Sequence, residues 1–294
     1  MSKIVRIGTR DSKLAIIQAE IVADAIRKHH PEIGTELVKI KSTGDIILDK
    51  NLDQIGGKGV FVKELNEALR RGDVDICVHS YKDVPADDDP DLPIVAVSAR
   101  EDPRDVLILP RPITEAGSEK PVGCSSKRRQ IQLADIFPGK PLAPIRGNVL
   151  TRLDKLDRGD YSALVLAAAG VKRLNLWDRV SRVFSVEEIL PAGCQGMLAV
   201  QGRRGEDYGF LSEFSDVDAL DASMAERAFI KRLDGGCGAP AGVFGEARGS
   251  ELKLRGMIET DDKTAYYDEI TGGRESAAQL GVKLADKMIK GGIA

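Results

Sequence analysis

The sequence predicts an α/β fold in three consecutive units, and three patterns support that prediction. Near the N-terminus a strand, a helix and a second strand follow one another, which is typical of a parallel sheet covered by helices. After about residue 120 the same alternation starts again. Beyond about residue 240, three strands separated by short turns indicate an antiparallel meander, followed by a last helix.

The first unit is expected to contain strands at 4–7, 38–40 and 74–78. A helix over about 13–28 has its apolar residues at helical spacing, and Pro31 ends it. A second amphipathic helix ends at Gly72. Residues 98–105 hold a proline and five charges, which predicts a crossover to the next unit.

The second unit is expected to have strands at 121–124, 141–145 and 163–169, each followed by a turn into a helix. Residues 190–200 predict a return crossing into a strand, so two chain segments form a hinge between the first two units. The third unit is expected to combine a helix at 221–233, strands near 243–247, 252–258 and 265–270, and a helix at about 275–290. The predicted domains are therefore 1–98 with 197–217, then 99–196, then 218–294.

Composition excludes several classes of protein. The 294 residues carry a net charge of −3, which argues against a chain-wide electrostatic fit to nucleic acid. No apolar run reaches the roughly 20 residues that a membrane span needs, and the first thirty residues hold charges throughout and no signal-peptide core, so we expect a cytoplasmic protein. The four cysteines lack a Cys-x-x-Cys pair and the three histidines are scattered, so we expect neither disulfides nor a metal.

The loop that follows the 221–233 helix surrounds Cys237 with glycines at 235, 236 and 238. Glycine after a helix is a common stop signal, so a simple helix cap is the commoner explanation. The alternative is a thiol held out as an attachment point. The helix dipole at a C-terminus disfavours a thiolate, so Cys237 suits a permanent thioether better than catalytic turnover.

A polar cluster follows the apolar strand at 74–78 and contains Ser80, Lys82 and Asp83. Ligands of α/β proteins bind at the carboxyl ends of strands, so this cluster indicates a pocket. Asp83 is its only acid and is the candidate to stabilise a cation or move a proton. Arg10 and Ser12 lie in the first βα turn, although Ser12 fits a plain N-cap equally well.

Basic residues follow the three strands of the second unit. We expect them to converge on one face of the sheet, at or near helix N-termini, where the helix dipole opposes a cation unless an anion lies between them. Arginine's planar fork suits carboxylates. The pattern predicts a crevice for a small molecule with several carboxylates or phosphates, lined by Arg128, Arg129, Arg146, Arg152, Lys172 and Arg173.

With these residues identified, the chain resembles the porphobilinogen deaminase (hydroxymethylbilane synthase) family of tetrapyrrole biosynthesis over nearly its whole length. The resemblance rests on blocks that occur in the family's order: Gly8-Thr9-Arg10 with Ser12, residues 56–65, residues 78–85, residues 125–130, Arg146-Gly147-Asn148 with Arg152, and Gly235-Gly236-Cys237.

The resemblance implies two domains folded like periplasmic solute-binding proteins and a small third α+β domain. It also implies a dipyrromethane cofactor joined by a thioether to Cys237. The enzyme would add four porphobilinogen units with loss of ammonia, and water would release the tetrapyrrole. It would act as a monomer, without metal, nucleic acid or membrane.

In this family interpretation Asp83 stabilises the azafulvene cation left by ammonia loss, and Gln195 lines the hinge side of the cleft. Phe61 packs on a pyrrole ring, although a core position fits it equally well. The groups that would bind cofactor and substrate carboxylates are Arg10, Ser12, Lys58, Ser80, Lys82, Ser126, Arg128, Arg129, Arg146, Arg152 and Arg173.

The chain departs from the family pattern at three positions. Gln54 stands where a lysine is frequent, Cys124 where a threonine is common, and Gly238 replaces a bulkier residue. These departures affect substrate contacts and leave the acid and the tether in place.

Three other functions compete with this one. A binding protein for a small polyanion leaves the Gly-Gly-Cys loop and Asp83 unexplained. The effector-binding region of a transcriptional regulator is disfavoured, because no helix-turn-helix segment precedes the first strand of this chain. A cysteine-nucleophile enzyme lacks a partner base, for which His79 is a poor substitute.

Overall fold

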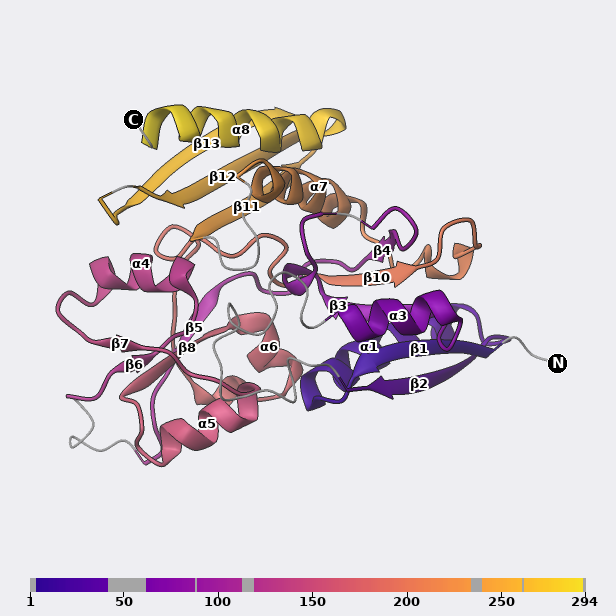
Figure 1. Cartoon of the computed structure of the whole chain (residues 1–294), viewed down its shortest axis with the longest axis horizontal. Helices are drawn as coiled ribbons and strands as arrows, with labels where there is room; N and C mark the ends of the chain where they lie inside the picture. Colours follow the sequence, from indigo (N-terminus) through magenta and orange to yellow (C-terminus); the bar gives the residue numbers. More distant parts are fainter. Residues whose placement is uncertain are drawn as a thin grey trace. The chain divides into compact units, whose positions relative to one another are not determined.

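The computed structural model describes residues 4–41, 62–87, 89–112, 119–233, 240–260 and 262–292. The chain divides into two compact units (Figure 1). The first combines Met1–Glu101 with Met197–Leu220, and the second combines Asp102–Gly196 with Asp221–Ala294. The second unit therefore holds both the second α/β sheet and the C-terminal meander, and the three-domain boundaries given above stay a prediction.

The first unit is a five-stranded sheet in the order β2-β1-β3-β10-β4. Strands β1, β2 and β3 are parallel, whereas β10 is antiparallel to both of its neighbours, β3 and β4. The elements are β1 (Ile4–Arg10), α1 (Lys13–His29), β2 (Gly34–Ile40), α3 (Lys63–Arg71), β3 (Ile76–Ser80), η2 (Tyr81–Asp83), β4 (Ile94–Val97), β10 (Leu198–Gly202) and η5 (Gly209–Leu211).

Helices cover both faces of this sheet. Successive side chains of a strand point to opposite faces, so each face forms its own apolar cluster. Ile76 and Val78 of β3 pack in one cluster with the buried face of α1. Cys77, between them, packs in a second cluster with Leu65 and Leu69 of α3. The apolar run at 74–78 is therefore a buried strand, as predicted, and Gly72 ends α3 with a φ of 74°.

The second unit contains a five-stranded sheet of the same design, in the order β7-β6-β8-β5-β9. Strands β6, β7 and β8 are parallel, and β5 is antiparallel to β8 and β9. The elements are β5 (Asp105–Ile108), β6 (Val122–Gly123), α4 (Lys127–Ile136), β7 (Leu142–Ala143), α5 (Val149–Asp157), β8 (Ala163–Ala167), α6 (Ala168–Arg173), η4 (Trp177–Arg179) and β9 (Val180–Val183).

The two sheets share a topological rule. In each, the strand beside the third parallel strand comes from a segment that has just crossed from the other unit: β10 beside β3, and β5 beside β8. The predicted two-segment connection is thus present, but the sheets are mixed where the sequence predicted parallel ones. The β-α-β pattern revealed the parallel strands, and β4, β5 and β9 were not predicted.

The C-terminal part is a three-stranded antiparallel sheet with two helices, which confirms the predicted meander. Its helices meet closely, since a Cβ on Gly281 would lie 2.1 Å from the carbonyl oxygen of Ala225. The elements are α7 (Val217–Arg232), β11 (Ala241–Arg248), β12 (Glu251–Glu259), β13 (Ala265–Gly273), η6 (Arg274–Ser276) and α8 (Ala277–Gly292). The α/β class with this third sheet is confirmed.

Candidate active site

Asp83 lies in a tight turn that follows directly from the buried strand β3. The amide of Tyr81 donates to the carbonyl of Met197 at 3.0 Å, and the amide of Val84 donates to the carbonyl of Tyr81 at 3.1 Å. Tyr81 is buried, while Lys82 and Asp83 are half-buried. The turn therefore anchors its aromatic residue inside and presents an ammonium and a carboxylate side by side at the strand end.

Ser80 and Arg10 end neighbouring parallel strands, so they lie at the same edge of the sheet. The Ser80 hydroxyl accepts from Nε2 of Gln18, a buried residue of α1, at 2.8 Å. The Ser12 hydroxyl accepts from the amide of Ala15 at 3.3 Å and caps α1, as its simpler interpretation predicted. This edge thus joins hydroxyl, guanidinium, ammonium and carboxylate groups.

His79, next to Ser80, is held neutral. Its Nε2 lies 3.2 Å from Oε1 of Gln201, and its side chain is buried. Burial, assisted by the charge of Arg10 and opposed by the Gln201 hydrogen bond, lowers the pKa of His79 to about 4. A neutral, buried imidazole of this kind is a core group and does not supply the base that a cysteine-nucleophile enzyme would need.

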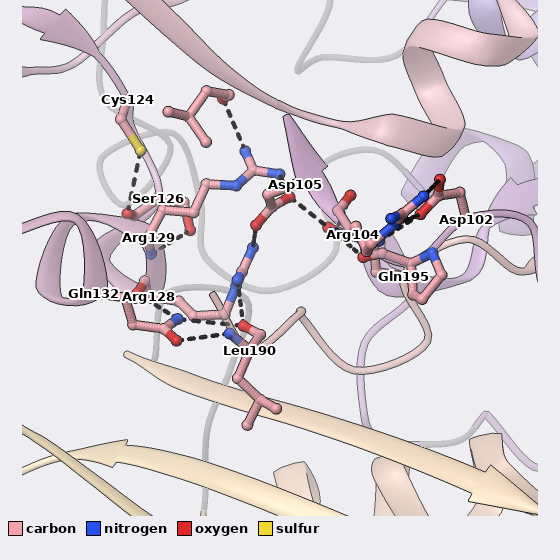
Figure 2. Close-up of polar contacts among 12 residues, drawn as sticks. Asp102, Arg104, Asp105, Cys124, Ser126, Arg128, Arg129, Gln132, Leu190 and Gln195 are labelled. Atoms are coloured by element: carbon pink, nitrogen blue, oxygen red, sulfur yellow. Dashed lines mark hydrogen bonds and ion pairs between the residues drawn. The ribbon is translucent and has the colours of Figure 1, made fainter. Parts of the chain in front are cut away.

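In the second unit the centre of the polar cluster is Asp105, the first residue of β5. Figure 2 shows its carboxylate between the guanidinium groups of Arg128 and Arg129. Oδ2 accepts from Nη2 of Arg128 at 2.8 Å, and Oδ1 accepts from Nη2 of Arg129 at 2.7 Å. Oδ1 also accepts from Nε2 of Gln195 at 2.9 Å.

These groups are all buried, and the charge of each affects the pKa values of the others. Burial alone would raise the pKa of Asp105, but the two arginines outweigh it and hold that pKa well below its usual range. Burial lowers the pKa of Arg128 against the opposing effect of Asp105. One carboxylate between two guanidinium groups leaves the cluster with a net positive charge, which favours an additional anion nearby.

Asp105 was not among the residues predicted from the sequence, although an anion was expected among the arginines. The protein itself supplies part of that negative charge. Arg128 also donates from Nη1 to the carbonyl of Leu190, and Gln195 donates to the carbonyl of Pro103 at 2.6 Å. Contact of these side chains with cofactor or substrate stays a prediction. Asp105 could have been found in the sequence as an acidic residue at the start of the apolar run at residues 106–108.

Arg146, in the loop after β7, and Arg152, in the first turns of α5, lie on either side of Gly147 in the chain. Arg152 donates from Nε to the Gly147 carbonyl at 2.8 Å, and Asn148 caps α5 by accepting from the amide of Thr151 at 3.0 Å. Gly147 has a φ of 109°, which L side chains rarely adopt. Before α4, the Ser126 hydroxyl accepts from the Arg129 amide at 3.4 Å. The two helix starts are thus capped beside the predicted basic groups.

The third pair of basic residues does not begin a helix. The strand predicted at 163–169 ends at Ala167, because α6 already begins at Ala168. Lys172 and Arg173 therefore lie in the last turn of α6, which corrects the expected N-terminal position. Arg173 donates from Nη2 to the carbonyl of Gly196 at 2.7 Å, so it holds the return crossing at residues 190–200, here called the second crossing segment.

Several predicted residues lie outside the described residues: Gln54, Lys58, Phe61, Cys237 and Gly238. The other three of the four cysteines, Cys77, Cys124 and Cys194, are buried. Burial raises the thiol pKa of Cys77 and of Cys124. In the described ranges no group of three or more histidine, cysteine or acidic side chains could hold a metal ion.

Polar and basic side chains at the carboxyl ends of parallel strands are typical of α/β proteins that bind small molecules at that edge. Two family models identify the family to which this chain belongs. The "Porphobilinogen deaminase, dipyromethane cofactor binding domain" matches residues 5–209, and the "Porphobilinogen deaminase, C-terminal domain" matches residues 220–290. The chain belongs to the porphobilinogen deaminase family.

Curated relatives agree over nearly the whole length. The porphobilinogen deaminase of Alkaliphilus oremlandii is 55% identical over 284 residues, which cover 97% of this chain and 96% of the relative. That of Acetivibrio thermocellus is 54% identical over 287 residues, 98% of each chain. That of Geotalea uraniireducens is 43% identical and covers 99% of this chain and 92% of the relative.

Solved structures give a weaker likeness. The BenM effector binding domain with its effector benzoate has a TM-score of 0.42 at 14% identity, covering 73% of this chain and 89% of that one. The Bordetella pertussis BvgS periplasmic VFT2 domain has a TM-score of 0.41 at 13% identity, covering 72% and 84%. Similarity this weak carries no argument about ligand or activity. Among the described helices, none is both long and apolar enough to span a membrane.

Proposed function

We propose that this chain is a transferase of tetrapyrrole and haem biosynthesis. It joins four porphobilinogen units in turn onto a dipyrromethane primer, with loss of ammonia at each addition, and releases hydroxymethylbilane by hydrolysis. Membership of the porphobilinogen deaminase family over residues 5–209 and 220–290 supports this proposal. The carboxylate of Asp83 at the end of β3 is the structural observation that carries it.

The donor chemistry of the chain fits a dipyrromethane, whose two pyrroles carry an acetate and a propionate each. Guanidinium groups pair with carboxylates through two parallel hydrogen bonds, and hydroxyl groups supply single donors. When bound, the dipyrromethane supplies the nucleophilic pyrrole carbon to which the first unit is joined. The side chains proposed to bind cofactor and substrate carboxylates are Arg10, Ser12, Lys58, Ser80, Lys82, Ser126, Arg128, Arg129, Arg146, Arg152 and Arg173.

Asp83 is the proposed catalytic residue. As the substrate's carbon–nitrogen bond breaks and ammonia leaves, positive charge spreads onto the substrate pyrrole. A half-buried carboxylate beside the ring nitrogen stabilises that charge more strongly than water does, because it is already oriented. The ring nitrogen donates its hydrogen bond to Asp83, which also orients the ring for carbon–carbon bond formation.

The second unit is proposed to hold the anionic side of the chain. Arg128 and Arg129 are fixed on Asp105, which keeps their guanidinium groups in place before any ligand arrives. Arg146 and Arg152 come from one loop and the helix that it begins. A site that is already rigid loses less side-chain entropy when it binds a polyanion.

Cys237 is proposed to hold the dipyrromethane through a thioether. It lies outside the described residues, between the end of α7 and the start of β11. The burial of the other three cysteines supports this assignment, because a tether must be reachable by a ligand. We further propose that the protein is cytoplasmic and monomeric and uses no metal.

The test is an intact mass of the purified protein with peptide mapping. We expect an excess equal to two linked pyrroles, located on Cys237 and absent from Cys237→Ser. Asp83→Asn should keep the fold and the cofactor but lose at least 100-fold in kcat, of the order found for removal of a preorganised charge-stabilising group. Asp91→Asn, which neutralises an exposed carboxylate in the segment before β4, should turn over normally.

Two results would contradict the proposal. Full turnover by Asp83→Asn would remove Asp83 from the mechanism. An unmodified mass that does not change after addition of porphobilinogen, together with no ammonia release by the wild-type protein, would favour a binding protein for small polyanions.

A further inference from the structure

We infer that Glu226 is a positioning residue that fastens the second crossing segment to the C-terminal sheet and thereby keeps the arginine pair Arg128 and Arg129 in place. The inference deepens the proposed function and rests on it for its kinetic consequence. Glu226 lies on α7, the helix that precedes the Cys237 loop.

The carboxylate of Glu226 is fully buried and joins two distant pieces of backbone. Oε2 accepts from the amide of Cys194 at 2.5 Å, and Oε1 accepts from the amide of Gly245 on β11 at 2.6 Å. Charge-assisted hydrogen bonds of this kind are roughly twice as strong as neutral ones. A single side chain of α7 thus joins the crossing segment to the sheet.

The backbone held by Glu226 has an unfavourable conformation. Cys194 has a φ of 60°, in the left-handed region, which residues with a Cβ rarely adopt. Such residues persist where the surroundings over-determine them, and they cluster at functional sites. Cys194, the residue with this conformation, is also the one whose amide donates a hydrogen bond to Glu226.

Packing on both sides brings the crossing segment close to α7 and β11. A Cβ on Gly193 would lie 3.2 Å from Cγ1 of Val243 and 3.3 Å from Cγ1 of Ile230, so only glycine fits without displacement. The amide of Val243 donates to the carbonyl of Pro191 at 2.9 Å. The segment therefore has little freedom while these contacts hold.

Gln195, which follows Cys194 in the chain, connects the segment to the arginines (Figure 2). Gln195 donates from Nε2 to Oδ1 of Asp105, the carboxylate that holds Arg128 and Arg129. Glu226 and Asp105 thus hold adjacent residues of one short segment. Release of Cys194 from Glu226 should loosen the Gln195 contact and so alter the orientation of the arginine pair.

The test compares Glu226→Gln with Phe229→Leu. The glutamine keeps the shape but turns an NH₂ group toward one of the two amide donors, which leaves a buried donor unsatisfied. Phe229 is fully buried on the same helix and does not belong to the Glu226 contacts, so its leucine variant serves as a control that also loses stability. Both variants are prepared from the full chain, and their unfolding is measured first.

The first readout needs no ligand. Amide hydrogen exchange of a peptide covering residues 190–197 should be at least tenfold faster in Glu226→Gln than in wild type, and within threefold in Phe229→Leu. Equal exchange in Glu226→Gln and wild type would overturn the contact itself, whatever the activity of the protein.

The second readout is kinetic. The KM for porphobilinogen should rise at least fivefold in Glu226→Gln with less than a twofold change in kcat, and stay within twofold in Phe229→Leu. In the double variant Glu226→Gln/Gln195→Ala, the KM should rise by less than the product of the single effects, since both act on one connection. Independent, multiplying effects or an unchanged KM would overturn the positioning role.

Two outcomes need a further experiment or readout: a Glu226→Gln variant that does not fold, and a wild-type protein without activity. If Glu226→Gln does not fold, Gly193→Ala displaces the same segment by a few tenths of an ångström and should change exchange and KM in the same direction. If the wild-type protein does not consume porphobilinogen, the proposed function fails, and the exchange experiment still decides whether Glu226 holds the crossing segment.

Discussion

Acidification from pH 7 to pH 5 should destabilise the folded chain by about 2 kcal/mol through His79 alone. Burial of its imidazole, assisted by the charge of Arg10 and opposed by the Gln201 hydrogen bond, lowers its pKa from the ordinary 6.5 to about 4. The folded state therefore binds this proton more weakly than the unfolded state does. Stability is complete above pH 6.5 and is lost progressively as the pH falls toward 4.

The magnitude follows from the two pKa values. At pH 5 the unfolded histidine is almost fully protonated while the folded one is mostly neutral, so the unfolded state gains a factor of roughly 30. Asp and Glu side chains titrate mainly below this range, and the chain has only three histidines. The interval between pH 5 and 7 therefore isolates the contribution of histidine.

The assay is urea unfolding at both pH values, combined with an NMR titration of the three imidazoles. The variant His79→Gln should lose less than about 0.5 kcal/mol over the interval, because it lacks the imidazole that gains a proton on unfolding. His29→Gln, which changes an exposed histidine, should behave like wild type. A pH loss in His79→Gln as large as that of wild type, or an NMR pKa of His79 near 6.5, would refute the reasoning.

Three further predictions concern the second unit. Asp105→Asn should cost about 3–5 kcal/mol of unfolding free energy, because it removes the carboxylate that both buried arginines share; a loss under about 1 kcal/mol in urea unfolding would contradict this. Gly147→Ala should cost about 1–3 kcal/mol and raise the KM for porphobilinogen, because the new Cβ would lie 2.7 Å from Cγ2 of Thr151 and shift Arg146; unchanged stability and KM would show that the loop adapts. Ser126→Ala should cost about 1 kcal/mol and Ser126→Gly only a few tenths by thermal unfolding, since serine caps α4; equal losses in both would exclude the cap as the cause.

Much of the fold could be predicted because its signals are local. Helical periodicity placed α1 within one residue of its observed bounds, and the spacing of turns revealed the C-terminal meander. The turn at Ser80–Asp83 was recognisable because a buried strand followed by charged side chains is unusual. These patterns depend on residues a few positions apart, whose relation survives in the bare sequence.

Other features depend on which distant segments meet. The antiparallel places of β5 and β10 follow from chain segments that return from the other unit, which a β-α-β pattern does not indicate. The early start of α6 was hidden because Ala168 and Ala169 suit a buried strand and a helix equally well.

The sequence by itself determined the α/β class, the basic and acidic residues at strand ends and the family resemblance, because each rests on residue types in a fixed order. Only the tertiary structure decided what those side chains contact. The partner of Arg129 is 24 residues away and that of Cys194 is 32 residues away. A buried charged group needs a counter-charge or hydrogen bonds, and packing determines which distant residue supplies them.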